Sequence, residues 1–347
     1  MSAHIHIQLL GHLTVTQDGE QRTRFRTQKT ASLLGYLACF LHRSHPREEL
    51  IDLFWPNADL GAGRSSLRTA LASLRRQLEP PGVVEGTVLM ADRLSVRLQS
   101  ESVSTDVDAF ERTLQRARRT EDLRDREREL SAAIALYGGP LLSGFYDDWV
   151  LRERTRLEQS YILALRDLVA TLETLEEWEP AIEMGHRLVV AEPLSEEGHL
   201  TLIRLYAALG QTSAARRQFR WMVAYALMGM ARMELFMGHM LPARDMFLQS
   251  LCILRDGGAP HRIASALLFL AQIAAKSGRL EPAVRLLGAV QGIEQAMDWT
   301  LTPGEWANYD ADIAAARTAL GEAQFDRFWA EGNEAALQEI LDEELLA

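Results

Sequence analysis

The chain has 347 residues, of which 47% are hydrophobic and 24% charged. At about 150 residues per domain, this length predicts two or three folded domains. The net charge of -11 excludes a chain that coats nucleic acid along its whole length. The charge is uneven, however, because residues 1–100 carry 12 Arg and Lys against 9 Asp and Glu, so +3, and the remainder carries -14. Only the first segment has the sign that a phosphate backbone attracts.

The cysteines and the absence of a signal segment predict a cytoplasmic protein. Cys39 and Cys252 lie far apart within apolar helical patterns, which predicts buried free thiols in a reducing compartment. No N-terminal stretch joins a basic region to an apolar one, as a secretory signal would. The longest run without charged or strongly polar residues, 223–231, is too short to span a bilayer.

A small β element is expected before the first helix. Apolar residues alternate with polar ones over 5–9, and Asp18-Gly19 is a turn signal. Thr27 can cap a first helix that runs to about residue 41. A second, short helix is expected to begin at Pro46, a residue suited to a first helical turn, and to stop before Pro56.

The third helix, over about 61–78, carries leucines on one stripe and small polar residues and arginines elsewhere. Arginine can read guanine edges or grip phosphate, and small side chains allow close approach to the major groove. The candidate DNA-binding residues of this helix are Arg64, Ser65, Arg68, Thr69, Ala72, Arg75 and Arg76. The alternative is a solvated amphipathic helix with ordinary surface arginines.

A hairpin is predicted over 83–98, with Arg93 near its tip as a further candidate DNA contact. Three helices followed by a hairpin is the order of a winged helix-turn-helix, which favours DNA binding over the alternative. Residues 1–100 are therefore predicted to be a DNA-binding domain.

The segments IQLLGHLTV, QKTASLLGYLA, REELIDLFWPNAD and RSSLRTALASLRRQLE resemble the DNA-binding half of the Streptomyces antibiotic regulatory protein (SARP) family. The resemblance covers nearly all of residues 5–98 and implies an OmpR-like fold. The wing departs from the family because it lacks the Gly-Tyr pair often seen before its last strand. Family activators bind tandem promoter repeats as dimers and recruit RNA polymerase, so the resemblance implies these partners.

The remainder is predicted to be an all-α array of tetratricopeptide-like helix pairs. ALYGGPLLSGFYDDWVLRERTRLE and the segment over 178–220 resemble the bacterial transcriptional activator domain, which follows the winged helix in the same family. Independently of the family, WEPAIEM, LPARDMF and LEPAVRLL echo one another around Ala181, Ala243 and Ala283, with a weaker copy at Ala214. The predicted domains are residues 104–220 and 221–347.

The region from Met222 to Met246 holds seven of the eleven methionines. We interpret it as an ordinary Met-rich core, with an adaptable groove for a partner helix as the alternative. A helix pair should turn near Arg220, although Gly229 is the only breaker. A protein or small-molecule effector is a further possible partner of these repeats.

The C-terminal tail from RLEPAVRLL to FDRFWAEG resembles the end of large regulators of the STAND and LuxR type, in which an ATPase module precedes the terminal repeats. No G-x-x-x-x-G-K-[ST] occurs, so we infer that this module is absent, with a junction near 218–224.

No catalytic constellation is found, and we expect neither an enzyme nor a cofactor. His4, His6 and His12, and the pair His42-x-x-His45, lack an obvious third ligand, so they are interpreted as surface histidines without a metal. The sequence thus predicts a DNA-binding transcription regulator. The alternative is an interaction scaffold whose winged helix no longer binds DNA.

Overall fold

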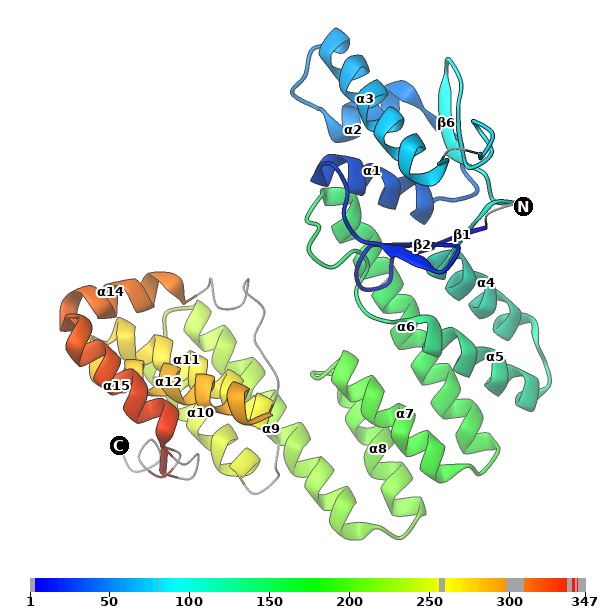
Figure 1. Cartoon of the computed structure of the whole chain (residues 1–347). Helices are drawn as coiled ribbons and strands as arrows, with labels where there is room; N and C mark the ends of the chain where they lie inside the picture. The colour runs from blue at the N-terminus through cyan, green and yellow to red at the C-terminus, as the bar shows by residue number, and fades with distance from the viewer. Residues whose placement is uncertain are drawn as a thin grey trace. The chain divides into compact units, whose positions relative to one another are not determined.

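The computed structural model of the protein describes residues 4–80, 82–255, 260–297, 309–335, 339–340 and 342. The chain divides into two compact units, Met1–Leu188 and Val189–Ala347, whose elements are drawn in Figure 1. The fold is mainly helical after a small β region, as the sequence predicts. Within the described ranges, no helix is both long and apolar enough to cross a membrane.

The first unit opens with a winged helix. Its elements are β1 (Ile5–Gln8), β2 (Thr14–Gln17), β3 (Glu20–Arg22), α1 (Gln28–Cys39), β4 (His45–Pro46), α2 (Arg47–Phe54), α3 (Leu60–Leu78), β5 (Leu89–Ala91), β6 (Ser95–Leu98) and β7 (Val103–Thr105). One sheet has the order β3-β2-β1-β7, and the second, which contains the wing hairpin, has the order β4-β6-β5. The predicted order of three helices followed by a hairpin is therefore confirmed.

Local sequence signals account for these elements. Asp18 and Gly19 both have positive φ, 52° and 83°, which is the conformation that an Asp-Gly hairpin turn requires. The Thr27 side chain caps α1 by accepting from the backbone N–H of Thr30 at 3.1 Å. The leucine stripe of α3 forms its core face, since Leu67, Leu71, Leu74 and Leu78 are at most 4% exposed.

The winged helix is followed by α4 (Asp106–Arg119), α5 (Leu123–Leu136), α6 (Asp148–Thr174) and α7 (Trp178–Ala191), and it packs directly against α4 and α6. The buried Asp106 carboxylate at the start of α4 accepts from the backbone N–H groups of Leu9 and Leu10, both at 2.8 Å. In addition, the Trp149 ring of α6 lies 5.1 Å from the Tyr36 ring of α1. Because these contacts are buried, a chain cut after the wing would expose apolar surface, so the experiments below use the full chain.

The second unit is an array of helices. They are α8 (Glu196–Ala208), α9 (Thr212–Phe236), α10 (Met240–Arg255), α11 (Pro260–Lys276), α12 (Leu280–Met297), α14 (Asp310–Leu320) and α15 (Glu322–Glu334). The alanines that mark the repeat, Ala181, Ala243 and Ala283, are at most 1% exposed, so each lies where two helices approach closely. Ala214, the weaker copy, is only half-buried.

Two expectations about the methionine-rich region are wrong. The turn near Arg220 does not occur, because α9 runs unbroken from Thr212 to Phe236 and holds Gly229 within a regular helix. The methionines do not form an ordinary core either. Of the seven between Met222 and Met246, only Met228 is buried, because α9 turns a second apolar face away from its own unit.

Two expectations about single side chains are also wrong. His45 is not a surface histidine, because β4 pairs with β6 and places its ring in the core, 4.9 Å from the Tyr36 ring. Cys252 is not buried, because it lies on the outer side of α10. Cys39 is partly buried, and burial raises the pKa of its thiol.

His199 should make the stability of the second unit depend on pH. Its ring is 1% exposed and lies between Pro193 O and Gln218 Nε2, at 2.9 and 2.8 Å. Burial lowers the pKa of His199, and the nearby Arg262 charge lowers it further, so the fold favours the neutral ring. The unfolded chain takes up this proton near pH 6.5. The stabilisation that the neutral His199 ring provides should therefore be complete above about pH 6.5. It should decrease as the pH drops toward the folded-state pKa of His199.

Urea denaturation midpoints between pH 5 and 8 test this dependence. A His199→Gln variant should be less stable at pH 7.5 but should lose less stability on acidification. A residual slope is expected from His45, whose pKa burial also lowers. An unchanged slope in the His199→Gln variant would contradict the assignment.

Candidate nucleic-acid interface

The outer face of α3 presents small polar side chains together with arginines. Ser65, Thr69 and Ala72 are all exposed and follow one another at spacings of four and three, so they share one helix face. Arg68 and Arg76 flank this face and are exposed as well. In the part of the chain that the structure describes, Arg68 has no hydrogen bond or ion pair, and Arg76 only donates to Ala72 O at 3.3 Å. Their guanidinium groups are therefore available to an anionic partner.

The other two candidate arginines of α3 already have carboxylate partners. Arg64 donates to Glu48 Oε1 of α2 at 2.8 Å, but both side chains are more than half exposed. Such a surface ion pair contributes about 0–1 kcal/mol, so a phosphate could displace it at little cost.

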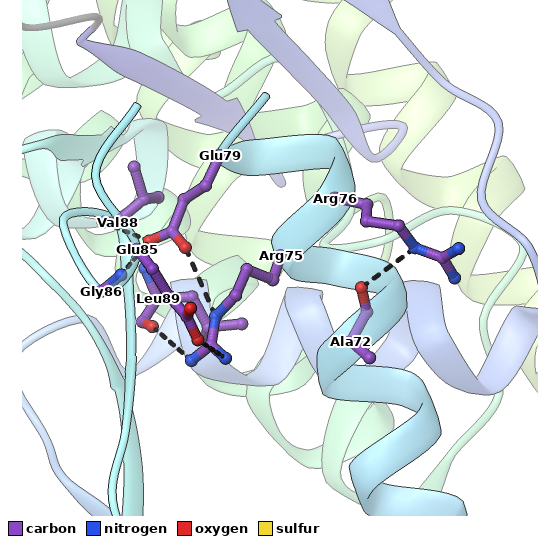
Figure 2. Close-up of polar contacts among 8 residues, drawn as sticks. All are labelled: Ala72, Arg75, Arg76, Glu79, Glu85, Gly86, Val88 and Leu89. Carbon is purple, nitrogen blue, oxygen red and sulfur yellow. Dashed lines mark hydrogen bonds and ion pairs between the residues drawn. The ribbon is translucent and has the colours of Figure 1, made fainter. Parts of the chain in front are cut away.

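Arg75 differs from its neighbours because it turns inward at the base of the wing. Figure 2 shows its side chain between Glu79 and Glu85, whereas Arg76 points away from them. Its guanidinium lies 2.5 Å from Glu85 Oε1 and 3.4 Å from Glu79 Oε2. It also lies 3.4 Å from the carbonyl oxygen of Leu89. Arg75 thus connects α3 to the segment that leads into β5, and the free charge of the outer face comes from Arg68 and Arg76.

The wing presents Arg93 at a tightly organised turn. Asp92 Oδ1 accepts from the backbone N–H groups of Leu94 and Ser95, both at 2.7 Å, and these hydrogen bonds lower the pKa of Asp92. Arg47, at the start of α2, donates to Asp92 O at 2.8 Å and connects the turn to the helices. Arg93 and Leu94 are left exposed at the tip. The predicted position of Arg93 at the hairpin tip is therefore correct.

The described part of the chain places no candidate metal site beside this surface. Among the described residues, no group of three or more His, Cys, Asp and Glu side chains is placed to hold a metal ion. The arrangement is an exposed cationic helix face beside a cationic hairpin tip, which is suited to binding an anionic polymer.

Comparison with known families identifies the segment that follows the wing. The family model described as the bacterial transcriptional activator domain matches residues 105–226. This segment begins at Thr105, the last residue of β7, which completes the winged helix. Residues 105–226 therefore carry this activator domain. The match includes α4 to α8 and more than half of α9.

Curated relatives of this chain are longer proteins. Putative HTH-type transcriptional regulators of Mycobacterium bovis and Mycobacterium tuberculosis are 29% identical to it over 188 residues. The match covers 52% of this chain but only 20% of the length of each relative.

A solved structure shares the fold of this chain over about two thirds of its length. Mycobacterium tuberculosis EmbR, in complex with a low-affinity phosphopeptide, superposes with a TM-score of 0.54 at 23% identity. The superposition covers 64% of this chain and 59% of EmbR.

Three residues of the candidate interface were missed by sequence reasoning. Glu79 supports the wing, Asp92 organises its tip, and Arg97 is an exposed cation on the outer face of β6. Arg97 could have been found, because it lies between the inward-facing Val96 and Leu98 and must therefore point outward. Glu79 and Asp92 carry no comparable signal for these roles, since the groups that they fix in the wing are backbone N–H groups.

Proposed function

We propose that the protein is a cytoplasmic, non-enzymatic transcription regulator that binds promoter DNA through α3 and the wing. The winged helix, residues 1–100 in this proposal, recognises the sequence. The helical part, residues 104–220 and 221–347, contacts the transcription machinery. The family match and the curated HTH-type relatives support regulation of transcription.

The observation that carries the proposal is the exposed face of α3. Its face residues Ser65, Thr69 and Ala72 leave room for base edges, while Arg68 and Arg76 flank them with uncommitted charge. The 19 residues of α3 extend for about 28 Å, and a major groove about 12 Å wide admits a helix. Arg93 at the wing tip supplies a second contact to the backbone or minor groove.

The helical part has the properties of a protein-binding module rather than a DNA-binding one. Residues 101–347 carry the net charge of -14, which repels DNA and suits a basic protein surface. The SARP resemblance makes RNA polymerase the first partner to test. The buried contacts of Asp106 and Trp149 hold α4 and α6 against the winged helix. The DNA-binding part and the first helices of the helical part are therefore packed together.

Substitution of the two uncommitted arginines should weaken DNA binding. The preferred sequence is first selected from genomic fragments with the purified full chain, and affinities are then measured on that sequence and on a scrambled one. Substitution of a base-reading arginine should cost about 1–3 kcal/mol of binding free energy, or about 5- to 150-fold in Kd, and should relax the sequence preference. Substitution of a phosphate-binding arginine should weaken binding to both DNAs equally. It should also reduce the salt dependence of binding by about one released counterion.

The variants are Arg68→Ala and Arg76→Ala, with Arg119→Ala as the matched control. Arg119 is also exposed, but it lies at the end of α4, away from α3. Its substitution therefore removes the same charge without changing the proposed interface. Unchanged affinity in the Arg68→Ala/Arg76→Ala double variant would contradict this mode of docking. No DNA binding by the unaltered chain would favour the interaction scaffold instead.

A further inference from the structure

The apolar residue Leu94 projects from the tip of the wing. Its side chain is 78% exposed, although the strands on either side of its turn bury Leu89, Val96 and Leu98. Single exposed apolar residues are common on protein surfaces, so exposure by itself gives Leu94 no role. Leu94 differs from such residues because the turn that carries it is held in one conformation.

Hydrogen bonds fix the turn on both sides of Leu94. The Leu94 N–H donates to Asp92 Oδ1 at 2.7 Å, and Leu94 O accepts from the backbone N–H of Arg47 at 2.9 Å. The Asp92 N–H donates to Ser95 O at 3.0 Å, and Asp92 O accepts from Arg47 Nε at 2.8 Å. Because Arg47 begins α2, these bonds join the tip to the helices of the winged helix. A side chain on a fixed turn loses little backbone entropy when it inserts into a partner.

The surroundings of Leu94 are cationic. Arg93 precedes it at the tip, and Arg97 is exposed on the outer face of β6. Within the described ranges, neither guanidinium has a hydrogen bond or an ion pair, whereas the Asp92 carboxylate is engaged by backbone N–H groups. A complementary partner must therefore present anionic groups around an apolar slot. The minor groove of DNA has this chemistry, because phosphates line its edges and apolar side chains can enter between its base pairs.

The position of the hairpin supports the same partner. The hairpin stands beside α3 in the same unit (Figure 1). Arg75 of α3 donates to Leu89 O of β5 at 3.4 Å, so the hairpin is connected to the helix that we propose for the major groove. Proteins that place a helix in the major groove can reach the adjacent minor groove with a neighbouring segment.

We propose that Leu94 inserts from the minor groove between two stacked base pairs and kinks the DNA. This inference rests on the proposed function and adds to it a residue that determines specificity through DNA deformation rather than through hydrogen bonds to bases. Insertion of this kind partly unstacks one base step and kinks the duplex by about 20–90° toward the major groove. Pyrimidine–purine steps such as TA are the most easily kinked, so the wing selects such a step.

Bending of the selected DNA by the full chain tests the insertion. Energy transfer between dyes at the two ends of the fragment should increase when the unaltered chain binds. Leu94→Ala should remove most of this increase, whereas Leu94→Phe, which keeps a large apolar side chain, should retain it. Leu163→Ala is the matched control, because Leu163 is 51% exposed on α6, outside the winged helix, and its substitution should leave the bend unchanged.

The base step beside the wing gives a second readout. An adenine analogue whose fluorescence rises on unstacking should brighten at this step with the unaltered chain and not with Leu94→Ala. Exchanging TA for AT at the step keeps the minor-groove acceptors but makes the step harder to kink. The exchange should weaken binding of the unaltered chain at least about fivefold, whereas Leu94→Ala should bind both DNAs equally.

The fixed turn can be tested through Asp92. Asp92→Ala removes the acceptor of the Leu94 and Ser95 N–H groups and should reduce the bend, although the loss of an acidic side chain by itself favours DNA binding. Asp92→Asn removes the same charge but keeps an oxygen acceptor, so it should retain the bend. An undiminished bend with Asp92→Ala would contradict a turn that positions Leu94.

The outcomes separate this inference from the proposed function. Sequence-preferring binding without bending, or bending that survives Leu94→Ala, would overturn the insertion of Leu94 and leave the proposed function intact. Absence of sequence-preferring binding by the unaltered chain would overturn both. Circular dichroism of each variant verifies that the fold is retained.

Discussion

Replacing Glu79 with alanine should destabilise the winged helix by at least about 3 kcal/mol, because three backbone N–H groups lose their acceptor at about 1–3 kcal/mol each. The Glu79 side chain is 2% exposed, and its Oε1 accepts from the backbone N–H groups of Gly86, Val88 and Leu89 at 2.8–3.0 Å (Figure 2). Without the carboxylate, these donors lose their partner, and Arg75 loses one of its two anions.

Chemical denaturation and amide hydrogen exchange measure this effect. Exchange should accelerate at Val88 and Leu89, because their N–H groups lose the carboxylate acceptor. Glu85→Ala is the matched control, since Glu85 contacts the same Arg75 but is 73% exposed, and its removal should cost less than about 1 kcal/mol. Equal stability of the two variants would show that Glu79 does not anchor the wing.

The wing anchor also connects stability to DNA binding. Glu79 fixes the segment before β5, and β5 pairs with β6 to hold Arg93 at the turn between them. Partial release of this segment in the Glu79→Ala variant should weaken DNA binding even though Glu79 itself carries the wrong charge to contact DNA. Alanine at Arg75, which belongs to the same anchor, should weaken DNA binding in the same way.

Alanine at Gly288 or Gly332 should destabilise the second unit by at least about 2 kcal/mol, within the range expected for overpacking. The helices α12 and α15 cross at these glycines. A Cβ at Gly288 would lie 2.2 Å from Trp329 O, and one at Gly332 would lie 2.0 Å from Arg285 O. Both obstacles are backbone atoms, so the helices must separate.

Separation of the two helices would break specific contacts. The indole N–H of Trp329 donates to Gln291 Oε1 at 2.7 Å, and Arg285 pairs with Glu331 at 2.7 Å across the same crossing. The buried Phe325 would also lose packing. Thermal denaturation followed by circular dichroism measures the expected loss.

Gly229→Ala is the control for the glycine substitutions. Gly229 is also helical, but a Cβ there meets only Leu194 Cδ2, at 3.8 Å. Alanine should therefore raise stability by up to about 1 kcal/mol, because glycine is the poorer helix former. A stabilised Gly288→Ala variant would mean that the helix crossing is looser than described.

Local sequence signals determined much of the fold. The Asp18-Gly19 turn, the Thr27 cap and the leucine stripe of α3 all depend on residues within a few positions of one another, so their patterns are readable in the chain. The same reasoning placed Arg93 at the hairpin tip. It also recovered the repeat, because Ala181, Ala243 and Ala283 must be small wherever helix pairs pack.

The tertiary structure alone decided which of these side chains are available for binding. Helical spacing placed Arg75 on the same flank as Arg64 and Arg68, but the carboxylates of Glu79 and Glu85 turn it inward. The same limit applies to α9, whose methionines have the composition of a core although most of them lie outside it. Burial and ion pairing depend on which distant segments approach a residue, and that approach is fixed only when the helices and the wing pack together.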